Sequence, residues 1–192
     1  MQSIAFDLDG TLVDLMAVFK RLLKSVYNID YDDSKQTRFH VNVDGLTDTQ
    51  IRDLIWQSTE AYATTPIYPG VPELMKYVYK LTDQPIKIIT NRPIHVTEET
   101  YRLVKRFCHV PFELVINYRG YPKSIYLNGY DMYVEDRRAN ALHIATAGKV
   151  VFLIDRPWNQ FETDLPIFRI NDIREINTLM HSPQVVTAVR GW

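Results

Sequence analysis

Short apolar runs alternate with segments of helical period along most of the chain. The apolar runs do not alternate strictly with polar residues, which is typical of strands that a parallel sheet buries on both faces. They predict strands over residues 3–6, 86–89, 112–116, 131–134, 150–154 and 167–170. Helical spacing of apolar residues predicts helices over residues 71–81, 97–107 and 138–147. This alternation predicts an α/β domain with a mostly parallel sheet.

The segment between the first two predicted strands is much longer than one crossover helix requires. Within it, residues 14–27 and 47–63 each have the pattern of a helix, and Thr47 and Gln50 have the spacing of a capping box. We therefore expect a small helical cap in this part of the chain.

The expected organisation is one core domain with one insertion. Residues 1–13 and 66–192 form the core, and residues 14–65, called the insertion below, form the helical cap over the end of the first strand. Residues 182–192 have little pattern, and the sequence predicts no element there.

Composition excludes several classes of function. The 192 residues include 22 basic and 23 acidic ones, and the net charge of −1 does not favour binding to a nucleic acid polymer or a membrane. No apolar run approaches the roughly 20 residues of a membrane-spanning helix, and the early Asp7 argues against a signal peptide. The single cysteine, Cys108, fits a reducing compartment, so we expect a cytoplasmic protein. The five histidines lack the spacing of a zinc site.

The sequence Asp-Leu-Asp-Gly-Thr at residues 7–11 directly follows the first predicted strand. Two carboxylates so close together can bind a hard cation, and a glycine beside them lets the backbone approach a ligand. An EF-hand alignment would place Ala5 and Met16 at ligand positions, which excludes a calcium loop of that type.

Two other predicted strands also end in polar residues. Thr90 ends the second strand, and Glu135 and Asp136 follow the fourth. Ligands of an open parallel sheet bind beyond the carboxyl ends of its strands, so we expect Asp7, Thr90 and Asp136 to converge there. Taken alone, Glu135 and Asp136 would be interpreted as a solvated turn, but the presence of Asp7 at another strand end favours a ligand-binding site.

These motifs, in this order, resemble those of the haloacid dehalogenase-like (HAD) phosphohydrolase superfamily. Residues 7–11 match its first motif, Thr90 its second, Lys123 its third and residues 135–136 its fourth. Lys123 is matched by position alone, and a surface lysine is the alternative. The resemblance implies a Rossmann-like core with a cap inserted between the first and second motifs.

The resemblance also implies a role for each residue. Asp7 would be the nucleophile that forms an aspartyl-phosphate, and Asp9 would be the general acid and base. Mg²⁺ would be held by Asp7, by Asp9 through its backbone carbonyl, and by Asp136. Glu135 would hold a metal-bound water. The residues implied to bind the phosphate are Gly10, Thr90, Asn91 and Lys123.

A closer resemblance, to the 5′(3′)-deoxyribonucleotidase-like branch of bacteria and their phages, rests on the compact cap, on Glu-Asp-Arg at 135–137 and on residues 152–159. It implies a nucleoside monophosphate substrate. The candidate substrate contacts are Arg92, Arg137, Phe19 and Trp56. Cap aromatics can stack a base, or they can form the cap's own core.

The sequence thus predicts a Mg²⁺-dependent phosphomonoesterase for a small phosphorylated metabolite, with a nucleoside monophosphate favoured and a homodimer allowed. One alternative is a phosphatase for a sugar phosphate or another small metabolite. Another is a nucleotide- or protein-binding module without turnover, which the presence of both Asp7 and Asp9 disfavours.

Overall fold

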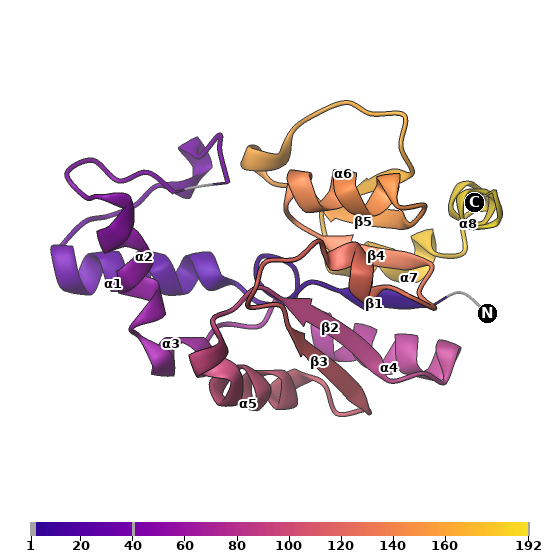
Figure 1. The fold of residues 1–192 in the computed structure, drawn as a ribbon, viewed down its shortest axis with the longest axis horizontal. Helices are drawn as coiled ribbons and strands as arrows, with labels where there is room; N and C mark the ends of the chain where they lie inside the picture. Colours follow the sequence, from indigo (N-terminus) through magenta and orange to yellow (C-terminus); the bar gives the residue numbers. More distant parts are fainter. Residues whose placement is uncertain (1–2, 40, 192) are drawn as a thin grey trace.

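Six parallel strands form one sheet in the order β3-β2-β1-β4-β5-β6 (Figure 1). A computed structural model describes residues 3–39 and 41–191, apart from the side chains of Arg52 and Trp56. The strands are β1 (Ile4–Phe6), β2 (Ile86–Thr90), β3 (Phe112–Ile116), β4 (Met132–Glu135), β5 (Val150–Ile154) and β6 (Ile167–Ile170). Their ends lie within about one residue of the predicted ones, so the expected α/β fold with a parallel sheet is confirmed.

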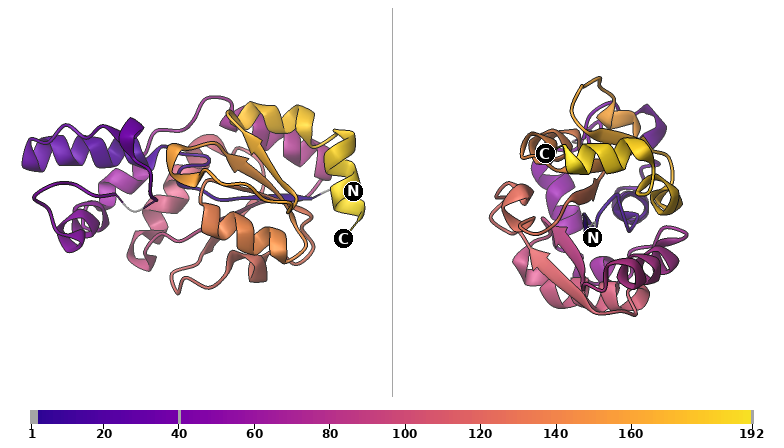
Figure 2. Two further views of the ribbon diagram at one scale, coloured as in Figure 1. Left: turned by 90° about the horizontal axis from the view of Figure 1, so that it is seen from above. Right: turned by 90° about the vertical axis from the view of Figure 1, so that its right-hand side faces the viewer.

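Helices cover both faces of this sheet (Figure 2). The helices on one face are α4 (Val71–Thr82), α5 (Thr97–Phe107), α7 (Ile176–Leu179) and α8 (Pro183–Arg190), and α6 (Arg138–Thr146) is on the other. Within β1, Phe6 belongs to the first core and Ala5 to the second, and both are fully buried. Burial on both faces explains why the strands lack polar alternation. Among the described residues, no helix has the length and apolar character to cross a membrane.

All elements between β1 and β2 that precede α4 gather beyond one end of the sheet (Figure 1). They are α1 (Leu15–Tyr27), the 3-10 helix η1 (Asp33–Lys35), α2 (Asp48–Trp56) and α3 (Thr59–Ala63). Phe19 and Leu23 of α1 pack with Val43 and Ile51 in a small core of their own. The amphipathic helices α1 and α2 therefore bury their apolar faces against each other rather than on the sheet, whereas α3 packs against α5.

The chain leaves the sheet domain at residues 12–14 and re-enters it at residues 66–68, and these two segments are hydrogen-bonded to each other. The amide of Asp14 donates to the carbonyl of Pro66 at 2.8 Å, and the amide of Tyr68 donates to the carbonyl of Leu12 at 3.1 Å. Asp14 also caps α1, because its side chain accepts from the amide of Ala17 at 2.9 Å. These bonds fix where the insertion begins to diverge from the sheet.

The single helix predicted over residues 47–63 is wrong, because two helices, α2 and α3, occupy that range. The predicted capping box of Thr47 and Gln50 does begin α2. The break falls at Ser58, whose hydroxyl donates to the carbonyl of Leu54 at 2.9 Å. Serine competes for backbone bonds in this way and so favours helix ends over interiors.

Residues 182–192 contain a helix, α8, that the sequence did not predict. Ser182 caps it by accepting from the amide of Val185 at 3.3 Å, and Pro183 occupies the first turn. Val185 is fully buried against the sheet core. One short apolar stripe is too little pattern to predict a helix, but tertiary packing stabilises it.

Candidate active site

The two central strands bring three acidic residues together at the carboxyl edge of the sheet. Asp7 directly follows β1, Glu135 ends β4, and Asp136 comes next. Phe6 pairs with Val134 across these strands, and the amide of Asp7 donates to the carbonyl of Val134 at 2.8 Å. The strand order reverses between β1 and β4, which is the point where open α/β sheets bind their ligands.

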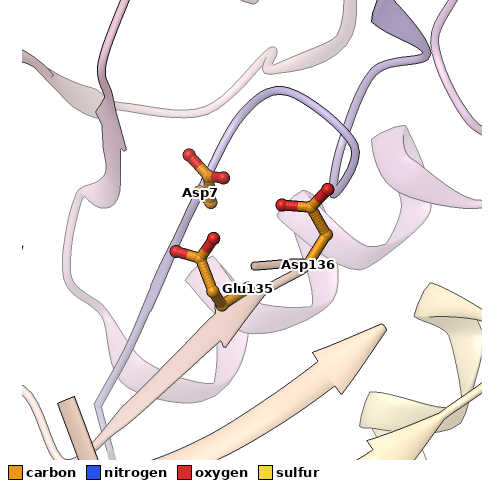
Figure 3. A group of neighbouring side chains, drawn as sticks. All are labelled: Asp7, Glu135 and Asp136. Atoms are coloured by element: carbon orange, nitrogen blue, oxygen red, sulfur yellow. The ribbon is translucent and has the colours of Figure 1, made fainter. Parts of the chain in front are cut away.

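Asp7, Glu135 and Asp136 form a buried carboxylate cluster (Figure 3). One oxygen from each lies within 4.8 Å of the others. Burial raises the pKa of Asp7 and of Asp136 well above the usual value, and the charge of Glu135 raises both further. Crowded, desolvated oxygen ligands of this kind suit a hard divalent cation, whose charge would offset their repulsion. The cluster therefore fits Mg²⁺.

Lys123 is buried against this cluster rather than lying on the surface. Its side chain is 2% exposed, and Nζ lies 2.6 Å from Asp7 Oδ1 and 3.0 Å from Glu135 Oε2. Burial lowers the pKa of Lys123, but the charges of Asp7 and Glu135 outweigh burial and hold it well above its usual value. Lys123 is therefore a permanent cation at the end of β1, and the surface-lysine alternative is wrong.

Asp9 forms a bidentate ion pair with Arg92. Nη2 of Arg92 donates to Oδ1 at 2.7 Å, and Nε donates to Oδ2 at 2.9 Å. The hydroxyl of Thr90 also donates to Oδ2, at 3.4 Å. The Arg92 side chain is only 1% exposed, while that of Asp9 is 22% exposed. The carboxylate is thus held from behind by the arginine and open on its other side.

The acidic cluster, Lys123 and the Asp9–Arg92 pair with Thr90 all line one cavity of about 270 Å³, together with Asn91 and Arg137. Its outer wall includes Leu15, Phe39 and Ile55, which come from the segment between β1 and β2. The guanidinium of Arg137 lies 4.5 Å from the centroid of the Phe39 ring. The structure therefore brings most of the predicted site residues into one space and adds an apolar wall, of which the sequence indicated the cap aromatic Phe39 but neither Leu15 nor Ile55.

Among the described side chains, Phe19 and Gly10 are the predicted site residues that do not line this cavity. Phe19 is 1% exposed in the core of the insertion and borders a second hollow of about 200 Å³ beside the first. The side chain of Trp56 lies outside the described part of the chain. Gly10 borders the second hollow and packs against Asp136.

Gly10 is required at its position by two independent features. Its φ of +77° is a left-handed conformation that favours glycine. A Cβ there would lie 2.1 Å from Asp136 Oδ2 and 2.6 Å from its Cγ. The loop after β1 can therefore approach the carboxylate of Asp136 only because residue 10 has no side chain.

Arg156 and Asn159, which follow β5 in the chain, hold the loops that carry the acidic cluster in place. Asn159 is fully buried, and its Nδ2 donates to the carbonyls of Asp136 and Ile154, each at 2.7 Å. Nη2 of Arg156 donates to the carbonyl of Gly10 at 2.9 Å. Both residues belong to the stretch at 152–159, but the sequence analysis assigned no role to either. Asp155 and Arg156 follow β5 directly, so polar residues at a strand end were a signal for Arg156, whereas nothing in the pattern marked Asn159.

Solved hydrolases of the HAD superfamily have the same fold. A predicted phosphoglycolate phosphatase from Haemophilus somnus 129PT matches with a TM-score of 0.64 and 18% identity, over 94% of this chain and 98% of its own. A HAD-superfamily hydrolase of subfamily IA from Geobacter sulfurreducens PCA matches with a TM-score of 0.59 and 16% identity, over 93% and 99%.

An L-2-haloacid dehalogenase from Xanthobacter autotrophicus, solved with chloropropionic acid covalently bound, matches with a TM-score of 0.65 and 12% identity, over 95% of this chain and 100% of that one. No protein-family model and no curated protein sequence matches the chain. The protein thus has the Rossmann-like α/β fold of the HAD hydrolases, with an acidic cluster at the topological switch point of its sheet.

Proposed function

We propose that this protein is a Mg²⁺-dependent phosphomonoesterase in which Asp7 is the nucleophile. The observation that carries the proposal is the buried group of Asp7, Lys123, Glu135 and Asp136, which lines a cavity beside Asp9. The fold, which is shared with a predicted phosphoglycolate phosphatase, supports the same class of reaction.

In the first step, a carboxylate oxygen of Asp7 attacks phosphorus, and the bond from phosphorus to the ester oxygen breaks. Asp9 gives a proton to the departing oxygen, so that an alcohol and an aspartyl-phosphate result. In the second step, water attacks phosphorus and gives its proton to Asp9. Inorganic phosphate leaves, and the carboxylate of Asp7 is restored.

Mg²⁺ would be held by Asp7 and Asp136, with Glu135 binding through a water and Asp9 through its backbone carbonyl. When bound, the cation supplies positive charge that reduces the repulsion between the nucleophile and the phosphate. Lys123 supplies a second positive charge to the phosphoryl oxygens. The backbone amide of Asn91 and the Thr90 hydroxyl, turned from Asp9 toward the phosphoryl group, complete the set of donors.

The insertion acts as a cap on a core of residues 1–13 and 66–192. Leu15, Phe39 and Ile55 give the cavity an apolar outer wall, which excludes water from the reacting groups. The cavity of about 270 Å³ favours a small substrate. Phe39 with the guanidinium of Arg137 suits a flat leaving group, so we infer a nucleoside monophosphate.

A phosphatase for another small metabolite is the second candidate. It is favoured by the structural similarity to a predicted phosphoglycolate phosphatase. A panel of substrates that contains nucleoside monophosphates, sugar phosphates and phosphoglycolate separates the two, because only one class will have a high kcat/KM.

The test is phosphate release from this panel with Mg²⁺ or EDTA, comparing wild type with Asp7→Asn. Asparagine has nearly the same size and is a far poorer nucleophile, so turnover should fall by several orders of magnitude while the melting temperature stays similar. Glu113→Gln is the matched control, because Glu113 pairs with Lys87 away from the cavity. Turnover that survives in Asp7→Asn would refute the nucleophile. A wild type that binds nucleotides without any release would favour a binding module instead.

A further inference from the structure

Every N–H of the buried Arg92 guanidinium is directed at another group of the protein. Nε and one N–H of Nη2 donate to Asp9. Nη1 donates to the carbonyl of Tyr62 at 3.2 Å and to the hydroxyl of Thr100 at 3.4 Å. The remaining N–H of Nη2 points to the Thr65 hydroxyl at 3.4 Å. A guanidinium has five N–H donors, so none remains for the substrate contact that the sequence suggested.

The pair with Asp9 fixes both oxygens of that carboxylate. Side-on contacts of 2.7 and 2.9 Å match the planar fork of arginine to the plane of the carboxylate. The backbone reinforces this geometry, because the amide of Arg92 donates to Thr90 Oγ1 at 3.2 Å and this hydroxyl donates to Asp9. A leaving group can therefore reach the Asp9 carboxylate only from the side that faces away from Arg92.

The same guanidinium binds the end of the insertion. Tyr62 lies in the last turn of α3, and Thr65 directly precedes the return of the chain to the sheet domain. The Arg92 guanidinium also lies 4.9 Å from the centroid of the Tyr62 ring. A displacement of residues 62–65 relative to β2 would therefore disturb the bonds that hold Asp9.

We propose that Arg92 is a positioning residue: it directs the carboxylate of Asp9 toward the leaving oxygen and couples that direction to residues 62–65 of the insertion. This inference rests on the proposed role of Asp9 as the general acid. Arg92 itself touches neither the substrate nor the metal. Because Arg92 holds Asp9, the carboxyl group that donates the proton is already oriented when the insertion is docked. Asp9 then need not be ordered during the reaction.

The test compares two leaving groups in Arg92→Met. A nitrophenolate departs without a proton, whereas an alkoxide requires one, so only the second needs a well-placed general acid. The expected result is a loss of about 10²-fold in kcat/KM with an alkyl phosphate and a much smaller loss with p-nitrophenyl phosphate. The ratio kcat/KM includes every step up to departure of the leaving group, so the later hydrolysis of the aspartyl-phosphate does not obscure the comparison.

Arg106→Met tests the coupling to the insertion. Nη1 of Arg106 donates to the carbonyls of Ala63 and Thr65, at 2.8 and 3.4 Å, and so holds the same part of the insertion without touching Asp9. This variant keeps the Arg92 fork, so its loss should be smaller than that of Arg92→Met and should again fall mainly on the alkyl phosphate, whereas an equal loss with both leaving groups would overturn the coupling. Arg92→Lys keeps the charge but loses the fork, so it should recover part of the loss with the alkyl phosphate.

Equal losses with the two leaving groups in Arg92→Met would overturn the inference. The crystal structure of Arg92→Met tests it without any need for turnover. The Asp9 carboxylate should leave its present direction, and an unchanged Asp9 would overturn the positioning role. Failure of the proposed function has a different signature, which is full activity in Asp7→Asn.

Discussion

Lys123 Nζ and Asp7 Oδ1 lie 2.6 Å apart, and both side chains are almost completely buried. Glu135, which is fully buried, shares the same ammonium at 3.0 Å. One cation thus serves two carboxylates in a desolvated space, which makes the cluster sensitive to any change in its charge.

Lys123→Met should destabilise the protein by about 3–5 kcal/mol, because it leaves buried carboxylates without their cation. It should also reduce kcat by about 10²–10³-fold, as expected for loss of a donor to the phosphoryl group. Chemical denaturation and phosphate release measure the two effects. Lys24→Met is the control: Lys24 pairs with Asp30 at the surface, and surface pairs contribute about 0–1 kcal/mol. Equal losses of stability in the two variants would contradict the buried pair.

Mg²⁺ should raise the melting temperature of the wild type, because the cluster exists only in the folded state. At a concentration about 100 times Kd, the stabilisation is about 2.7 kcal/mol. Asp136→Asn should abolish most of this shift, and EDTA should reverse it in the wild type. Asp172→Asn is a suitable control, since Asp172 pairs with Arg174 at the surface. A shift that persists in Asp136→Asn would place the metal elsewhere.

In the metal-free protein, Asp7 and Asp136 should contribute a loss of stability as pH rises from about 4 toward neutral, opposite in sign to the contribution of Asp32 and Asp172, whose pKa values are lowered by hydrogen bonds. The folded-state pKa values of Asp7 and Asp136 are raised well above 3.8, chiefly by burial, so the folded state retains protons that the unfolded state releases. Stability from these groups is complete below the unfolded pKa and declines as pH rises through the folded pKa. Urea unfolding in EDTA at several pH values measures the slope. Relative to the wild type, Asp136→Asn should gain stability as pH rises and be more stable at pH 7, and a variant that loses stability relative to the wild type over this range would contradict the sign.

Gly10→Ala should displace the carboxylate of Asp136. The new Cβ would meet Oδ2 at 2.1 Å, and the φ of +77° adds strain of about 1–2 kcal/mol. The expected result is loss of the Mg²⁺-dependent thermal shift and of phosphate release. Gly45→Ala separates the two causes, because Gly45 has a similar φ of +83° but no atom within 4 Å of the added Cβ. A retained metal shift in Gly10→Ala would show that the close approach is unnecessary.

The sequence predicted the acidic cluster because strand ends are local features. Asp7 and Asp136 directly follow apolar runs, and parallel strands bring such positions to one edge whatever the connections between them. Lys123 had weaker support, since it follows no strand directly, and only its burial against Glu135 identifies it as part of the cluster.

The arrangement around Arg92 could not be predicted in this way. Its partners Tyr62 and Thr65 come from the insertion, and nothing in the residue pattern fixes how a helical cap docks on a sheet. From the sequence alone, Arg92 was therefore only a candidate substrate contact. The break between α2 and α3 was missed for a related reason. The helical pattern over residues 47–63 is continuous, but the helix is interrupted at Ser58, whose hydroxyl donates to the carbonyl of Leu54.

The backbone bonds of Leu12 to Tyr68 and of Asp14 to Pro66 mean that the insertion leaves and returns at almost one point. A module attached in this way can be shortened, exchanged or redesigned while the loops that carry the acidic cluster keep their places, because its removal opens no gap in the sheet. Evolution can therefore change what such a protein recognises independently of how it reacts. Arg92 and Arg106, which both reach from the sheet domain to residues 62–65, limit that freedom there.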